Sequence, residues 1–254
     1  MASLARALPN LATLGNALLG VGAIAYTLLG NKLFAVLLVV AGVSLDGLDG
    51  MLARRAGVTN RRFGRVADSA ADAISFGVAP ALFVGYHSFE AATWAPYTAA
   101  TWGVAALVIV TAFARLTYFT LRAFDKPYFV GVPTPLAALS IGVLVLLFDQ
   151  PPLVGTLPVP FLVGAALTAV AMVLPLPYPK VRRNSSIRAP MFVTAGALVL
   201  SVIVLQFAPS SESGFWWLAF AMTLVAAAGL LTYYFLGPTT VRRDRRRTEA
   251  LSHA

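Results

Sequence analysis

Four aspartates lie close together in a chain that has few charges. Only 11% of the 254 residues are charged, and four of the ten acidic residues fall between positions 46 and 72. Asp46 and Asp49 are three residues apart and Asp68 and Asp72 are four apart, so each pair lies on one face of a helix. Four carboxylates turned towards one point would repel each other and take up protons unless positive charge lay between them. The spacing therefore predicts a shared cation site.

The composition restricts the kind of cation. The chain has no cysteine, and its two histidines, His87 and His253, lie far from the aspartates in the sequence. Ligand sets made only of oxygen suit hard cations such as Mg²⁺ or Mn²⁺. Two such ions about 3.5–4 Å apart can bind the attacking and leaving oxygens of a phosphoryl transfer. We expect two divalent cations with all four aspartates as ligands.

Two other interpretations of the aspartates remain open. Ion pairs with Arg54, Arg55 and Arg65 at a membrane boundary could neutralise some of them. Carboxylates inside a membrane also line proton and ion pathways in transporters. Against a transporter, the four aspartates cluster at one membrane edge, and the sequence has no interrupted hydrophobic segments in matching positions of two halves.

Membrane helices must position these aspartates. The chain is 59% hydrophobic, which excludes an ordinary soluble domain, and apolar runs of about 20 residues recur along it. We predict an all-α integral membrane protein with about eight transmembrane helices, in which the aspartates end the second span and begin the third. The predicted spans are approximately Leu11–Leu29, Leu33–Leu52, Ser69–Tyr86, Tyr97–Leu121, Pro133–Phe148, Pro158–Leu174, Pro190–Phe207 and Phe215–Leu236.

The basic residues predict the orientation in the membrane, because cytoplasmic loops are enriched in Lys and Arg. With a cytoplasmic N-terminus, 18 of the 19 basic residues fall on the cytoplasmic side, and Lys32 is the exception. Both termini and the aspartates are then cytoplasmic. The net charge of +9 reflects this topology and contact of the Arg242–Arg247 run with anionic lipid, so it does not indicate a nucleic-acid partner.

The aspartate motif resembles that of the CDP-alcohol phosphotransferase family, D-x2-D-G-x2-A-R-x8-G-x3-D-x3-D. Nine residues, not eight, separate the arginine from the second glycine here, and the extra residue falls in a loop, where an insertion is tolerable. Both aspartate pairs keep their internal spacing. In this chain the motif reads Asp46, Asp49-Gly50, Ala53-Arg54, Gly64, Asp68 and Asp72.

Further segments resemble the serine-using branch of that family, the phosphatidylserine and archaetidylserine synthases. The resemblance covers roughly Leu8–Lys180 and implies a core over residues 1–180, two additional helices over 181–236 and a basic cytoplasmic tail over 237–254. A homodimer is implied by the resemblance alone. The segments are Leu8–Asn16 (LPNLATLGN), Ile74–Leu82 (ISFGVAPAL), Ala114–Phe119 (ARLTYF), Phe129–Pro135 (FVGVPTP) and Tyr178–Lys180 (YPK).

The resemblance implies transfer of a lipid phosphate from CDP-diacylglycerol or CDP-archaeol to the hydroxyl of L-serine, with release of CMP. It assigns all four aspartates to metal binding and Asp72 also to general-base catalysis. Gly50 and Arg54 would hold the CDP group, by close backbone approach and by charge on the diphosphate. Ala53 would leave room for this ligand, although small residues also serve tight helix packing. Asn10 and Thr13 are candidate nucleotide contacts or helix caps.

The acceptor pocket is predicted around Arg115, the most inward-placed of the remaining cations. We expect Arg115 to pair with the serine carboxylate or to act as one more positive-inside anchor. The turn that holds Gly131, Pro133 and Thr134 would shape the pocket. Another alcohol, such as inositol phosphate, glycerol phosphate or ethanolamine, remains an alternative acceptor. The last two predicted spans contain no residue to which we assign chemistry.

Overall fold

The fold consists of helical segments and one short ribbon of two strands. The computed structural model describes residues 2–55, 62–91, 95–123, 128–149, 158–179, 185–207 and 214–252. Within these ranges eight continuous helical segments occupy the eight predicted spans, which confirms the predicted architecture. They are α1 (Ala2–Leu28), α2 (Lys32–Arg55), α3–η1–α4 (Arg62–Asp72, Ala73–Val78, Ala79–Ala91), α5–η2 (Ala95–Tyr118, Phe119–Ala123), α6 (Thr134–Phe148), α7 (Pro158–Val173), α8 (Ser185–Phe207) and α9 (Gly214–Ser252).

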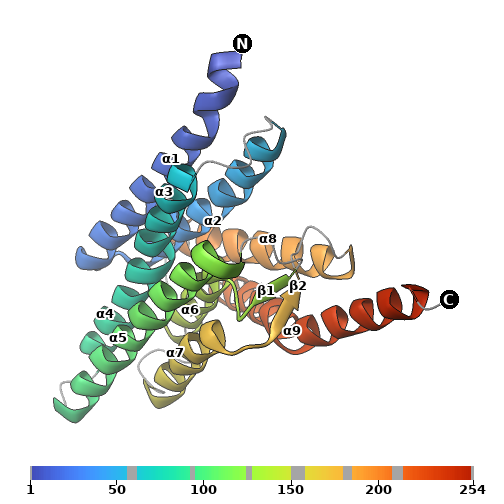
Figure 1. Ribbon diagram of the computed structural model, residues 1–254. Helices are drawn as coiled ribbons and strands as arrows, with labels where there is room; N and C mark the ends of the chain where they lie inside the picture. Colours follow the sequence, from blue (N-terminus) through green and yellow to red (C-terminus); the bar gives the residue numbers. More distant parts are fainter. Residues whose placement is uncertain are drawn as a thin grey trace.

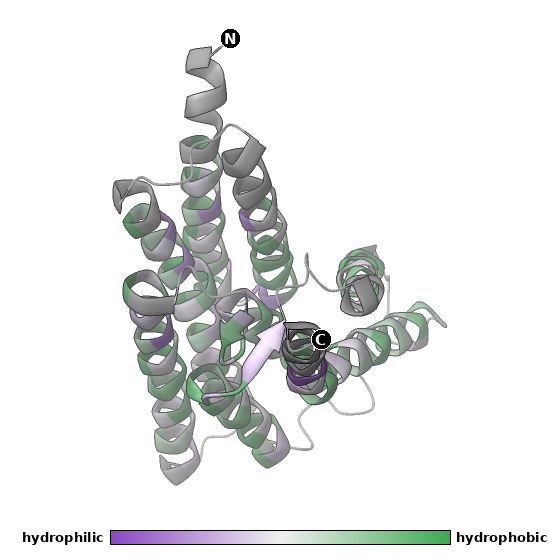
Figure 2. Ribbon diagram, turned by 45° about the vertical axis from the view of Figure 1, so that its right-hand side comes forward, coloured by the Kyte–Doolittle hydropathy of each residue, from purple (hydrophilic) through white to green (hydrophobic). Residues whose placement is uncertain are grey.

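Hydropathy and length identify the chain as an integral membrane protein. Hydrophobic residues dominate the coloured parts of the helices, with few hydrophilic positions between them (Figure 2). Helices α6, α7 and α8 each contain a shorter apolar stretch. Among the described residues, four segments are long and apolar enough to cross a membrane: Leu11–Leu28, Val66–Tyr86, Tyr97–Leu121 and Gly214–Arg243.

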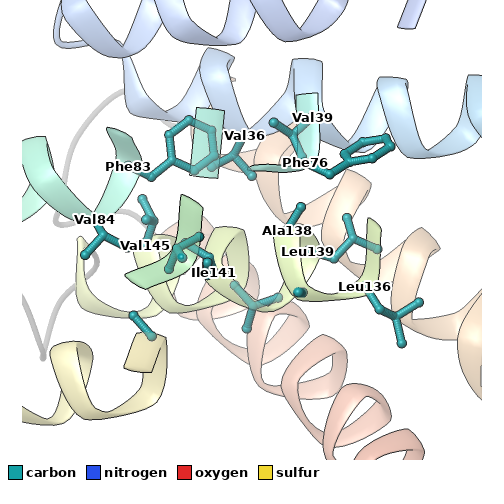
Figure 3. Close-up of a cluster of buried hydrophobic side chains, with 14 of the residues drawn as sticks. Val36, Val39, Phe76, Phe83, Val84, Leu136, Ala138, Leu139, Ile141 and Val145 are labelled. Atoms are coloured by element: carbon teal, nitrogen blue, oxygen red, sulfur yellow. The ribbon is translucent and has the colours of Figure 1, made fainter. Parts of the chain in front are cut away.

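Helix α6 lies at the centre of the core. It is apolar on all sides and packs against α2, α4, α7 and α9, as expected for a fully buried helix. Ile141 of α6 is fully buried, and Figure 3 shows α6 side chains beside Val36 of α2 and Phe83 of α4. Figure 1 shows α1, α2, α4 and α5 extending side by side, while the pair α8 and α9 runs at a different inclination.

Close packing of α1 against the π-helical segment η1 sets the position of Asp72. A Cβ atom on Gly20 would lie 2.7 Å from the Ser75 Cα atom and 2.9 Å from the Ser75 nitrogen, so only glycine permits this approach. The Ser75 hydroxyl then donates a 2.8 Å hydrogen bond to the Asn16 carbonyl. Because η1 begins directly after Asp72, this contact holds the start of the third predicted span against α1.

The ribbon was not predicted from the sequence. Strand β1 (Tyr128–Val130) pairs antiparallel with β2 (Pro177–Pro179), with Phe129 opposite Tyr178. Gly131 follows β1 at φ +75°, and a Cβ atom there would overlap the Met172 carbonyl group. The next amide, Val132, donates a 3.0 Å hydrogen bond to the Ala171 carbonyl near the end of α7. The turn before α6 is thereby fixed to α7.

Replacing Gly20 with alanine tests the packing of α1 on η1. We expect Gly20→Ala to destabilise the protein by about 1–3 kcal/mol, because overpacking against the Ser75 backbone forces the two helices apart. Thermal unfolding in detergent measures the loss. Gly196→Ala is the matched control, since a Cβ atom there meets no atom within 4 Å. Equal midpoints for the two variants would contradict the close approach.

Candidate active site

Three of the four predicted ligands meet at one point of the bundle. Asp46 lies on α2, and Asp68 and Asp72 lie on α3. Each of the three offers a carboxylate oxygen, and these oxygens lie within 4.8 Å of one another. This is the separation expected of groups that share a cation, and all three are oxygen donors. The group could therefore bind a hard metal ion.

Asp72 is the most enclosed of the three carboxylates. Its side chain is 9% exposed, and it accepts a 3.0 Å hydrogen bond from the Asn16 Nδ2 atom of α1. Three charged groups interact with it: Asp46, Asp68 and Arg115. A buried carboxylate beside two others needs compensating positive charge. Arg115 supplies one positive charge. The negative charge that is left favours a cation between the carboxylates.

Arg115 is a buried cation beside the carboxylates. It lies on α5, is 6% exposed, and its Nη1 atom donates a 2.6 Å hydrogen bond to the Thr134 hydroxyl. The guanidinium carbon lies 5.7 Å from the ring centroids of both Phe119 and Phe129, at cation–π distance. The bond from α5 to Thr134, the first residue of α6, brings the predicted turn to the side of the site.

Two buried polar atoms at this site have no hydrogen-bond partner among the described groups. They are the Asn16 Oδ1 atom and the Arg115 Nε atom. A buried polar atom without a partner costs about 1–3 kcal/mol, so such atoms in a native structure call for an explanation. An anionic ligand that accepts from the Arg115 Nε–H group would satisfy that atom, whereas the Asn16 Oδ1 atom lies close to Gly42 of α2. The site thus has the chemistry to bind a polar, anionic molecule next to a metal.

The remaining predicted residues divide into two groups. Asp49, Gly50, Ala53 and Arg54 lie on α2 and Asn10 lies on α1, but their side chains fall outside the part of the chain whose side chains are described. Thr13 is half-buried on α1, three residues before Asn16. Gly131 and Pro133 are buried in the turn that precedes Thr134.

Sequence reasoning missed two residues that approach the site. In the sequence Asn16 is only the last residue of a family-like segment, although a carboxamide in an apolar span is itself a signal of a buried partner. Tyr233 lies on α9, in a span without predicted chemistry, yet it is fully buried and donates a hydrogen bond to the Pro179 carbonyl of the ribbon whose Phe129 lies beside Arg115. No local pattern distinguishes it from its neighbour Tyr234.

Removing the amide that holds Asp72 should weaken metal binding. We expect Asn16→Leu to lower the affinity for Mn²⁺ by about 10–100-fold, the usual effect of losing a hydrogen bond that orients a ligand. Titration of free Mn²⁺ by electron paramagnetic resonance measures it. Thr27→Val is the control, because Thr27 is buried on the same helix and its hydroxyl donates to the Ala23 carbonyl of that helix. Unchanged affinity in Asn16→Leu would remove Asn16 from the site.

Comparison with known proteins agrees with this geometry. A sequence model of CDP-alcohol phosphatidyltransferases matches residues 6–176. A CDP-diacylglycerol–serine O-phosphatidyltransferase of Helicobacter pylori is 34% identical over 90% of this chain and 91% of that protein. One of Bacillus subtilis is 29% identical over 70% of this chain and 93% of its own length. An archaetidylserine synthase of Methanothermobacter thermautotrophicus is 34% identical over 54% of this chain and 56% of its own length. The chain belongs to the CDP-alcohol phosphatidyltransferase family.

Proposed function

We propose that this enzyme transfers a lipid phosphate from a CDP-linked lipid to the hydroxyl of L-serine and releases CMP, as a step of phospholipid biosynthesis. The observation that carries the proposal is the buried Arg115, whose Nε atom lacks a partner, beside three clustered carboxylates. Relatives named for transfer to serine, with diacylglycerol-based and archaeol-based products, support it. The lipid donor is CDP-diacylglycerol or CDP-archaeol.

The metal ligands in this proposal are Asp46, Asp49, Asp68 and Asp72. The three with described side chains offer only oxygen atoms within 4.8 Å, which fits Mg²⁺ or Mn²⁺. Asp49 follows Asp46 by three residues on α2, one turn closer to the end of the helix. Two bound divalent ions would neutralise the diphosphate and the departing CMP.

Residues near the motif would bind the donor. In this proposal Gly50 would allow close backbone approach of the CDP group, Ala53 would leave room for it, and Arg54 would pair with its diphosphate. Asn10 and Thr13 of α1 would contact the nucleotide. Helix α1 packs against both α2 and α3, so these two residues lie on a helix that borders the aspartates.

Asp72 is the proposed general base. It takes the proton from the serine hydroxyl as the serine oxygen bonds to the phosphorus of the lipid phosphate. The bond from that phosphorus to the CMP oxygen breaks, and the electron pair leaves with CMP. The amide of Asn16 holds one oxygen of Asp72 and leaves the other for this proton transfer.

The serine carboxylate would pair with Arg115. Thr134 occupies the Nη1 atom, so the carboxylate approaches from the side of the unpaired Nε atom. Gly131 and Pro133 would shape the wall of the pocket, in a turn that the Gly131 and Val132 amides tie to the carbonyls of Leu176 and Ala171. An arginine that offers two N–H groups in one plane suits a carboxylate better than a lysine would.

The proposed orientation places both termini and the active site at the cytoplasmic face. Lys32, the one basic residue assigned to the opposite side, forms a 3.6 Å ion pair with Asp149, which the topology also assigns there. We propose a core over residues 1–180, two further helices over 181–236, a basic tail over 237–254, and a homodimer. The family match over residues 6–176 supports a core that ends near residue 180.

A panel of alcohols tests the acceptor. Purified protein with CDP-diacylglycerol or CDP-archaeol and Mg²⁺ or Mn²⁺ should release CMP with L-serine, because only serine offers both a hydroxyl and the carboxylate that Arg115 can bind. A chelator should abolish release. CMP release with inositol phosphate, glycerol phosphate or ethanolamine in place of serine would select another acceptor, and metal-independent release would contradict the metal site.

Replacing the proposed base tests the mechanism. We expect Asp72→Asn to lower kcat by about 10²–10⁴-fold while CDP-lipid binding stays largely intact, because the amide has the same shape but cannot accept the proton. Single-turnover CMP release and CDP-lipid binding measure the two effects. Asp149→Asn is the control, because it makes the same change at an aspartate that pairs with Lys32 and is not one of the proposed metal ligands. Retained turnover in Asp72→Asn would exclude Asp72 as the base.

A further inference from the structure

Two adjacent tyrosines join helix α9 to the rest of the molecule in different ways. Tyr233 donates a 3.0 Å hydrogen bond to the Pro179 carbonyl of β2, and its ring stacks on Tyr178 at a centroid distance of 5.4 Å and an interplanar angle of 14°. The Tyr234 hydroxyl lies 3.2 Å from the Ser140 hydroxyl of α6 instead. The Tyr233 hydroxyl therefore bonds to the ribbon, whereas the Tyr234 hydroxyl bonds to the core helix, although the Tyr234 ring also meets Tyr178 edge-on at a centroid distance of 6.5 Å.

The sequence of α9 is adapted to this contact with β2. A Cβ atom on Gly237 would lie 3.0 Å from Tyr178 Cδ1 and 3.2 Å from Pro179 Cδ, so a larger residue would push the ribbon away. Pro238 has no N–H group and cannot donate to the Tyr234 carbonyl, four residues earlier. That carbonyl instead accepts a 3.4 Å hydrogen bond from the Tyr178 hydroxyl. One backbone carbonyl of α9 is thus available to bond with β2.

The ribbon contacts α9 through β2 and Arg115 through β1. Phe129 of β1 is paired with Tyr178 of β2, and its ring lies 5.7 Å from the Arg115 guanidinium. After β1 the chain turns at Gly131 and reaches Thr134, which accepts the hydrogen bond from Arg115. Phe129 and Thr134, which both contact the Arg115 guanidinium, therefore depend on the placement of the ribbon.

We propose that Tyr233 is a positioning residue for the acceptor pocket, and that helix α9 completes a pocket which the first 176 residues do not build alone. The inference rests on the proposed function, because it takes the surroundings of Arg115 as the acceptor site. It assigns a role in substrate selection to a helix that lies outside the family match. The proposed metal ligands lie on α2 and α3 and take no direct part in the contact between α9 and the ribbon, so donor binding should not depend on Tyr233.

The matched pair Tyr233→Phe and Tyr234→Phe tests the inference. Each variant removes one buried hydroxyl from the same helix. Loss of the Tyr233 hydrogen bond should raise the KM for the acceptor about threefold to tenfold, the effect of one net hydrogen bond, with the KM for CDP-lipid unchanged. Tyr234→Phe should leave both KM values unchanged. Steady-state CMP release at varied acceptor and varied CDP-lipid gives the four values.

A double-mutant cycle with Thr134→Val shows whether Tyr233 acts through Arg115. If it does, Tyr233→Phe should change the acceptor KM less in the Thr134→Val background than in the wild type, since coupled residues are not additive. Gly237→Ala, with Gly196→Ala as control, displaces the ribbon without removing a hydroxyl and should give the same rise in acceptor KM. This variant decides the question if Tyr233→Phe does not fold.

Several results would overturn the inference. They are an unchanged acceptor KM in Tyr233→Phe, an equal rise in Tyr234→Phe, a parallel rise in the KM for CDP-lipid, and full additivity with Thr134→Val. Each of these leaves serine-dependent CMP release by the wild type intact, so the proposed function survives. If the wild type uses another alcohol, the serine assignment fails and the comparison is made with that alcohol. If no alcohol supports CMP release, both proposals fall.

Discussion

An apolar helical bundle can hold three carboxylates within 4.8 Å of one another only if positive charge meets them. This electrostatic requirement explains why the surrounding polar residues are so few and so specifically placed. Asn16 holds Asp72, Ser75 holds Asn16, and Gly20 lets α1 come close enough for both contacts. Arg115 contributes one positive charge. The three carboxylates could hold a metal ion that adds the remaining positive charge.

The site is assembled from segments that are distant in the sequence. Helices α1, α2 and α3 bring the carboxylates and the Asn16 amide, while α5 and the turn before α6 bring Arg115 and Thr134. The ribbon of β1 and β2 connects this second side of the site to α9 through Tyr178 and Tyr233. In the proposed function, the donor and acceptor sides would depend on different parts of the bundle, and acceptor choice could vary without a change in the metal ligands.

Local sequence patterns predicted the features that local physics determines. Hydrophobic runs located all eight helical segments, and the three- and four-residue spacings placed Asp46, Asp68 and Asp72 on faces that meet. The pairing of Asn16 with Asp72 joins residues 56 positions apart, and no periodicity encodes which face of α1 meets η1. The two three-residue strands could not be predicted from the sequence either. Strand β2 has proline at both ends, and proline is normally disfavoured in strands. Tyr233 could be separated from Tyr234 only by tertiary contacts.

Crystals soaked in Mn²⁺ and measured for anomalous scattering offer the most direct test of the shared cation site. The account predicts anomalous peaks between the carboxylates of Asp46, Asp68 and Asp72, at oxygen–metal distances of about 2.0–2.4 Å. In crystals of Asp72→Asn the metal should remain beside Asp46 and Asp68 and lose one of its ligands. Mn²⁺ bound only elsewhere on the protein, with these three carboxylates left without a metal, would contradict the account.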